Sequence, residues 1–134
     1  MSDSIVQTLP PQSLFGLFFE PTVKCVSAYL GGLRNGHTIL LINPSVNKDL
    51  QERILKKFSI NIIFKNEKFL HILTHTSQFK ENISEARILM STSGSTGSPK
   101  LVKLSATNLT SNASSIAKYL NLKSSDRAIS SLPF

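Results

Sequence analysis

The segment Ser91-Thr92-Ser93-Gly94-Ser95-Thr96-Gly97-Ser98-Pro99-Lys100 combines two glycines, several hydroxyl side chains and one lysine. Glycine lets the main chain approach a ligand closely and adopt a positive φ. Consecutive amides and hydroxyls can then donate hydrogen bonds to phosphate oxygens, and the lysine supplies a positive charge. This composition predicts a backbone cradle for a polyphosphate, and a nucleotide is the first ligand to consider.

The residues on either side of this loop predict a β-hairpin. Arg87-Ile88-Leu89-Met90 before the loop is typical of a strand, and Leu101-Val102-Lys103-Leu104-Ser105 after it alternates apolar and polar residues. A helix is expected only after the hairpin, with Ser105 or Thr107 as its N-cap and its end near Leu120. The apolar side of this helix is predicted to consist of Leu109, Ile116, Tyr119 and Leu120.

Two other interpretations of the loop compete with this prediction. A Walker A loop needs a Gly-Lys-[Ser/Thr] triplet that opens directly into a helix. Here Gly94 and Gly97 are three apart, Lys100 follows a proline, and Leu101 stands where Ser or Thr would bind magnesium, so the spacing argues against that motif. A ligand-free hairpin tip is the other alternative, because Ser and Gly are common turn residues. The fixed order Ser-Gly-Ser-Thr-Gly-x-Pro-Lys disfavours it.

The first half of the chain alternates predicted strands and helices. Strands are expected at Leu14 to Phe19, Thr38 to Ile42 and Ile60 to Phe64, with helices from Pro21 to Asn35-Gly36 and from Asn47 to Phe58. The first helix is predicted to bury the stripe Val23, Val26, Leu30 and Leu33, and the second Leu50, Ile54, Leu55 and Phe58. A short strand from Phe69 to Leu73 is possible in an otherwise ambiguous region. The order predicts an α/β fold: a parallel-sheet βαβαβ core, followed by the hairpin with its phosphate loop and a further helix.

The segment from Thr92 to Lys100 resembles the signature loop of the adenylate-forming (AMP-binding) enzymes, which include acyl- and aryl-CoA synthetases, peptide-synthetase adenylation domains and luciferases. The resemblance spans roughly Leu14 to Phe134, and Leu101 departs from it because the family usually has glycine there. Weaker similarities are found at Ala28 to His37, Ile42-Asn43-Pro44, Leu104 to Leu109, Asp126-Arg127 and Ser131-Leu132-Pro133-Phe134.

The resemblance implies an N-terminal portion of a ligase that converts a carboxylic acid and ATP to an acyl-adenylate and pyrophosphate. The acyl group then usually passes to a thiol, such as that of coenzyme A or a carrier protein. ATP and Mg²⁺ are the implied cofactors, and Thr92, Ser93, Gly94, Ser95, Thr96, Gly97 and Lys100 are the implied ATP-binding residues. The family's catalytic residues have no counterpart here. Residues 1–134 are therefore expected to form one incomplete domain, part of a larger N-terminal domain and inactive by itself.

Composition leaves two other function classes open: a non-catalytic nucleotide-binding module or relic, and a basic nucleic-acid-binding domain. Fifteen Lys and Arg against eight Asp and Glu give a net charge of +7. The basic residues are spread among acidic ones, which favours a solvated surface over a nucleic-acid site. The sequence predicts no membrane span and no metal site, although His71 and His75 are four apart. The lone Cys25 favours a cytoplasmic protein, and residues 1–12 are expected to be poorly ordered.

Overall fold

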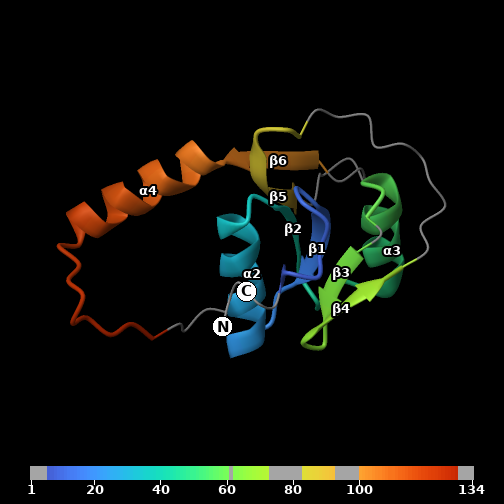
Figure 1. Cartoon of the computed structure of the whole chain (residues 1–134), viewed down its shortest axis with the longest axis horizontal. Coiled ribbons are helices and arrows are strands. Elements are labelled where there is room, and N and C mark those ends of the chain that lie inside the picture. Colours follow the sequence, from blue (N-terminus) through green and yellow to red (C-terminus); the bar gives the residue numbers. More distant parts are fainter. Residues whose placement is uncertain (1–5, 61, 73–82, 93–99, 130–134) are drawn as a thin grey trace.

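One mixed sheet organises the protein, as a computed structural model of residues 6–60, 62–72, 83–92 and 100–129 shows (Figure 1). Within these described residues, six strands lie in the order β4-β3-β1-β2-β5-β6. The strands are β1 (Leu14–Phe18), β2 (Thr38–Ile42), β3 (Ile62–Lys65), β4 (Lys68–His71), β5 (Ala86–Thr92) and β6 (Lys100–Ser105). The helices are α2 (Val23–Arg34), α3 (Lys48–Lys57) and α4 (Ala106–Tyr119).

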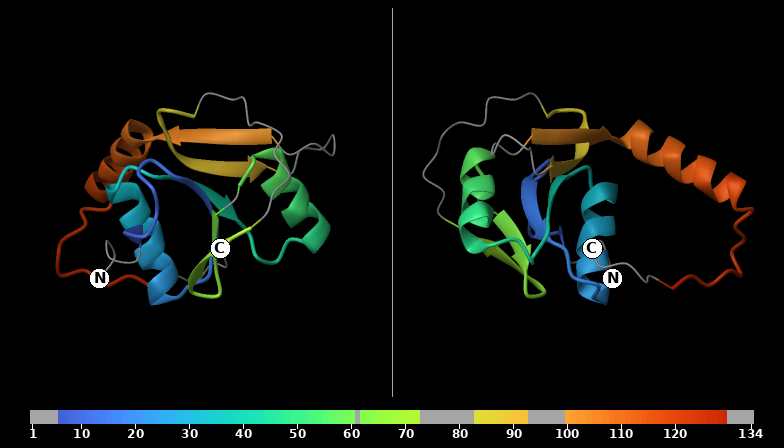
Figure 2. Two further views of the ribbon diagram at one scale, coloured as in Figure 1. Left: turned by 45° about the vertical axis from the view of Figure 1, so that its right-hand side comes forward. Right: turned by 180° about the vertical axis from the view of Figure 1, so that it is seen from behind.

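The predicted βαβαβ core is confirmed. Strands β1, β2, β3 and β5 are parallel, whereas β4 and β6 are antiparallel edge strands. Helix α2 follows β1 and α3 follows β2, and the two helices cover opposite faces of the sheet (Figure 2). Each face has its own hydrophobic cluster: Cys25 and Ala28 of α2 pack with Phe15, and Ile54 of α3 packs with Leu40. The connections after β1 and β2 therefore leave the sheet toward opposite faces.

The buried side of α2 differs from the prediction. Its buried residues are Cys25, Ala28, Gly31 and Gly32, whereas Val23 in the predicted stripe is 75% exposed. Small residues let the helix axis approach the sheet: a Cβ on Gly32 would lie 2.9 Å from Cδ1 of Ile39. Close backbone packing thus outweighs the burial of valine side chains on this helix.

The observed start of α2 also differs from the predicted start. The helix begins at Val23, and the hydroxyl of Thr22 caps it by accepting a hydrogen bond from the Cys25 N–H at 3.2 Å. Pro21 therefore lies outside the helix and not at its first position. The predicted end is confirmed, because Asn35 is the C-cap and Gly36 follows with φ +73°.

Helix α3 agrees with the prediction from its residue pattern. Asn47 caps it by accepting the Leu50 N–H at 2.8 Å, and Phe58 is its C-cap. Ile54, Leu55 and Phe58 are buried, as expected, and Leu50 packs partly buried against the same cluster. This helix therefore fixes the second face of the parallel core.

The first described residues are packed into the core, whereas helix α4 near the other end of the described chain is exposed. Val6 and Leu9, in the segment for which the sequence predicts poor order, are buried in the cluster under α2. Helix α4 is capped by Ser105, as predicted, and the Asn108 side chain accepts the Ser105 N–H in return. No residue of α4 is buried by the described chain, and Tyr119 is 88% exposed. None of the described helices is long and apolar enough to cross a membrane.

Candidate nucleotide site

Both strands of the hairpin that flanks the predicted phosphate loop are confirmed. Strands β5 and β6 pair antiparallel, and their last pair joins Thr92 to Lys100 at the base of the loop. Seven residues, 93–99, connect this pair, and among them Ser93, Gly94, Ser95, Thr96 and Gly97 lie outside the described residues. Of Thr92 and Lys100 the structure describes the backbone. The loop is thus anchored at both ends by a hydrogen-bonded strand pair.

The length of the loop bears on whether a phosphate group fits. Two residues are enough to join adjacent antiparallel strands, whereas residues 93–99 supply seven. Pro99 has no backbone N–H, and the other six residues each carry one such donor. The segment contains hydroxyl groups and no Asp or Glu. This donor set fits an anionic ligand such as a polyphosphate.

The carboxyl end of β5 lies at the edge of the sheet where α/β proteins bind ligands. Ile88 and Met90 of β5 pair in parallel with Ile39 and Leu41 of β2, so the carboxyl ends of both strands share one edge. Ligands bind outside this edge, where successive connections leave toward opposite faces. That switch occurs here between β1 and β2. The loop therefore begins one strand away from the switch point.

Two contacts hold the hairpin against the parallel core. The buried Thr38 hydroxyl donates a 2.8 Å hydrogen bond to the carbonyl oxygen of Ala86, which joins the start of β2 to the start of β5. Leu101 is partly buried and packs against the cluster under α3. Leucine at this position therefore anchors β6 to the core, which gives a structural role to the residue that departs from the family pattern.

A groove of about 590 Å³ lies beside the carboxyl ends of β2 and β5. The Phe19 and Tyr29 rings in its wall meet edge to face, with centroids 6.5 Å apart, and burial raises the pKa of Tyr29. Asn43 and Ser91 supply polar atoms. Residue patterns do not reveal this groove, because Val26 and Leu30, which line it, belong to the stripe of α2 that is predicted to be buried. The remaining lining residues are Val26, Leu30, Leu41, Ile42 and Met90.

Cys25 and His37 are the buried reactive groups among the described residues, and both have structural contacts. The Cys25 thiol accepts the Glu20 N–H at 3.3 Å and donates to the Phe18 carbonyl at 3.7 Å, and burial raises its pKa. His37 Nδ1 accepts the Ser13 N–H at 3.1 Å, and burial lowers the pKa of this imidazole. This hydrogen bond joins the residue before β2 to the segment before β1.

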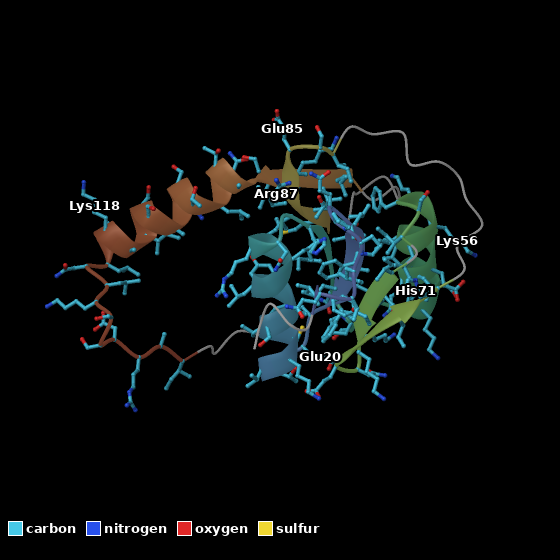
Figure 3. All side chains as sticks on the ribbon, viewed as in Figure 1. Glu20, Lys56, His71, Glu85, Arg87 and Lys118 are labelled. Carbon is cyan, nitrogen blue, oxygen red and sulfur yellow. The ribbon has the colours of Figure 1, made fainter. Side chains whose placement is uncertain are left out.

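The sequence offers two further histidines as candidate ligands, His71 and His75. His71 lies on β4 at the far edge of the sheet (Figure 3), and His75 lies outside the described residues. In the described ranges no three His, Cys, Asp or Glu residues are grouped as metal ligands.

A second hollow of about 400 Å³ lies at the opposite end of the hairpin, and Glu85, Lys103, Ser105 and Asn108 are among its lining residues.

Comparison with known proteins finds solved structures with a similar fold. No protein-family model and no curated protein sequence matches the chain. The fold is similar to that of the Bacillus subtilis o-succinylbenzoate coenzyme A synthetase (MenE), solved with AMP (19% identity, TM-score 0.74, 98% of this chain and 40% of that chain). The same synthetase has also been solved with ATP and a magnesium ion.

Two further solved enzymes have the same fold over most of this chain. The L. pneumophila fatty acyl-adenylate ligase, solved with acyl adenylate and pyrophosphate, has 23% identity and a TM-score of 0.63 over 91% of this chain and 26% of that chain. MatB of Rhodopseudomonas palustris, solved with ATP, has 16% identity and a TM-score of 0.64 over 90% and 30%. The chain thus spans less than half the length of these enzymes. Its fold is the one that the sequence resemblance implies, that of the N-terminal region of the adenylate-forming enzymes.

Proposed function

We propose that this chain is the N-terminal portion of an ATP-dependent, carboxylate-activating ligase. In the proposed reaction a carboxylate oxygen attacks the α-phosphorus of ATP, the bond to the β-phosphate oxygen breaks, and acyl-adenylate and pyrophosphate result. A thiol, of coenzyme A or of a carrier protein, then takes the acyl group and AMP leaves. One observation carries the proposal: a loop with the family's signature sequence joins β5 to β6 of a sheet that has the fold of such enzymes.

In this proposal the loop residues bind the β- and γ-phosphates. Ser93 to Gly97 would supply amide and hydroxyl donors, with Thr92 beside them, and Lys100 would add a cation opposite Thr92 at the base of the loop. Donors fixed before the reaction stabilise charge that accumulates on the leaving pyrophosphate. Mg²⁺ would accompany the phosphates, since divalent cations normally do. ATP and magnesium are both bound by the MenE synthetase, which supports this choice of ligands.

The proposal assigns binding and no bond-breaking chemistry to these 134 residues. No catalytic residue is assigned in the chain, and we expect no turnover from it alone. A cytoplasmic location is proposed because the lone Cys25, a buried free thiol, forms no disulfide. A nucleotide-binding module without catalysis is the alternative, and it would bind ATP through the same loop.

The test is the affinity of the chain for Mg-ATP in wild-type protein and two lysine variants. Lys100→Ala is expected to weaken binding about tenfold, in line with the loss of one charge-assisted contact. Lys118→Ala removes the same charge near the far end of α4 (Figure 3) and is the matched control, with unchanged affinity expected. Equal losses in the two variants would show that only net charge matters, and would contradict the proposed role of the loop.

A further inference from the structure

His37 is a buried ionisable residue that the proposed function does not use, and it connects three segments of the chain. It is 3% exposed and lies between the end of α2 and the start of β2. Its backbone N–H donates to the Gly32 carbonyl oxygen of α2 at 2.9 Å. Its Nδ1 atom accepts the Ser13 N–H at 3.1 Å, and the Ser13 carbonyl oxygen accepts the Thr38 N–H at 3.0 Å. The imidazole therefore holds the residue that directly precedes β1.

The hydrogen bond from Ser13 requires a neutral imidazole. A ring nitrogen that accepts a hydrogen bond carries no proton, so the proton of the neutral His37 ring is on Nε2. In the imidazolium both ring nitrogens are donors, and Nδ1–H would then face the Ser13 N–H. Protonation of His37 therefore removes this hydrogen bond and leaves two donors facing each other. It also places a positive charge in a buried position, which disfavours the charged form.

Residues 6–13 are attached to the rest of the described chain at two places, and His37 bears on both. Val6 and Leu9 are 1% and 9% exposed and belong to the cluster under α2, together with Phe15. Ser13 is held by the His37 ring. The rings of His37 and Phe15 meet edge to face, with centroids 6.3 Å apart, so the imidazole also borders the apolar cluster. A charge on His37 would therefore weaken the attachment of the whole segment.

The ionisable groups on the surrounding elements leave burial as the main influence on His37, and burial lowers its pKa. Residues 6–13 and strand β1 contain no ionisable side chain. Burial raises the pKa values of Cys25 and Tyr29 on α2, so both are neutral near pH 7. The charged and titratable residues on the neighbouring elements have both signs: Lys24 and Arg34 on α2, Lys68 and His71 on β4, and Glu85 and Arg87 on either side of Ala86.

We propose that protonation of His37 detaches residues 6–13 from the core while the sheet stays folded, so that this segment is a pH-dependent strap over the cluster under α2. In the detached state water reaches the imidazole, and its pKa returns toward 6.5. The attached state has the lower pKa, so detachment takes up a proton. Attachment is therefore strongest above pH 6.5 and weakens as the pH falls below it.

The rest of the fold does not depend on this segment. The cluster under α3 contains none of residues 6–13, and the strand pairs of the sheet begin at Leu14. Local opening of a terminal segment needs less free energy than global unfolding. The inference is independent of ATP binding, since none of its residues belongs to the segment from Thr92 to Lys100.

The test is amide hydrogen exchange of the whole chain, measured by NMR and corrected at each pH for the intrinsic exchange rate. The reporters are the N–H of Ser13 and that of Leu9, which donates to the Val6 carbonyl oxygen at 3.0 Å. Their protection is expected to fall about tenfold between about pH 7.5 and about pH 5.5. The Ile60 N–H, which donates to the Leu55 carbonyl oxygen at 2.9 Å, reports global unfolding and should stay at least about tenfold better protected. Equal protection of all three amides, or protection of Ser13 and Leu9 that does not change with pH, would overturn the proposal.

Variants decide whether His37 is the group responsible. Glutamine has an acceptor oxygen that does not titrate, so His37→Gln is expected to make the protection of Ser13 independent of pH. His71→Gln changes a histidine on β4 and is the matched control, which should keep the tenfold fall. A tenfold fall in His37→Gln, or its loss in His71→Gln, would contradict the role of His37.

Leu9→Ala tests the same coupling from the other end of the segment and leaves His37 in place. Truncating this buried side chain weakens the attachment. Because coupling between two sites is reciprocal, the pKa of His37, followed by NMR of its ring, is expected to rise toward 6.5 in this variant. Lowered protection of Ser13 with an unchanged pKa of His37 would overturn the proposal, even where His37→Gln does not fold.

Discussion

Replacing Gly32 with alanine tests how α2 packs on the sheet, which determines where the groove lies. A Cβ at this position would be 2.9 Å from Cδ1 of Ile39 and 3.1 Å from Cζ of Phe15. Both contacts are shorter than ordinary van der Waals distances. The Ile39 and Phe15 side chains are fully buried, so any movement must be made within a closely packed core. Either these side chains or the helix must shift to relieve the contacts.

Two opposing effects set the size of the change. Alanine is favoured over glycine in a helix interior by about 1 kcal/mol, whereas overpacking a well-packed core costs about 1–3 kcal/mol. Because the added methyl group makes two short contacts with fully buried side chains, we use the upper part of that range. Gly32→Ala is therefore expected to lower the free energy of unfolding by about 1–2 kcal/mol. Helix propensity alone predicts the opposite sign.

Urea denaturation followed by circular dichroism measures this free energy, since a single small domain usually unfolds in two states. Val23→Ala on the same helix is the control: Val23 is 75% exposed, so a change within about 0.5 kcal/mol is expected. A Gly32→Ala variant as stable as wild type, or more stable, would refute the close packing. A loss above about 1.5 kcal/mol in Val23→Ala would instead support burial of the stripe predicted from sequence.

Three further predictions concern buried polar groups. Thr38→Val removes the donor to the Ala86 carbonyl and should lower the free energy of unfolding by about 1 kcal/mol; an unchanged urea midpoint would contradict this. Burial lowers the pKa of His37 below 6.5, so the unfolded chain binds more protons, and stability should fall as pH drops below 6.5. His37→Gln should reduce this slope, and an equally steep slope in the variant would count against His37 as its source. The buried Cys25 thiol, whose pKa is raised, should react with a disulfide reagent mainly after urea unfolding; equally fast reaction of the folded protein would show that the site is open.

Residue patterns were enough to predict the order of the elements apart from β4, which lies in a region whose pattern is ambiguous. Alternating apolar runs gave the parallel core, and Asn47 and Ser105 cap their helices as expected. The orientation of α2 could not be predicted in the same way. Its valine and leucine stripe and its row of small residues both recur at helical spacing, and only the position of Ile39 and Phe15 beneath the helix decides between them.

Only part of the candidate site could be predicted from the sequence. The motif between Thr92 and Lys100 is local, so the sequence alone identified it, and the structure adds the strand pair that anchors it. The apolar groove depends on residues from α2, β2 and β5 that are far apart in sequence. The anchoring role of Leu101 likewise depends on contact with the cluster under α3. Such long-range features leave no local pattern in the chain.

The most direct test of the central claim is an amide NMR titration of the isotope-labelled chain with Mg-ATP. Adenosine without phosphates and a short DNA duplex serve as controls. We expect selective, saturable shifts at Gly94, Gly97 and their neighbours with Mg-ATP, and none there with adenosine or DNA. Loop amides that Mg-ATP leaves unchanged in a folded spectrum, or that DNA shifts equally, would contradict the assignment of this loop as the phosphate-binding site.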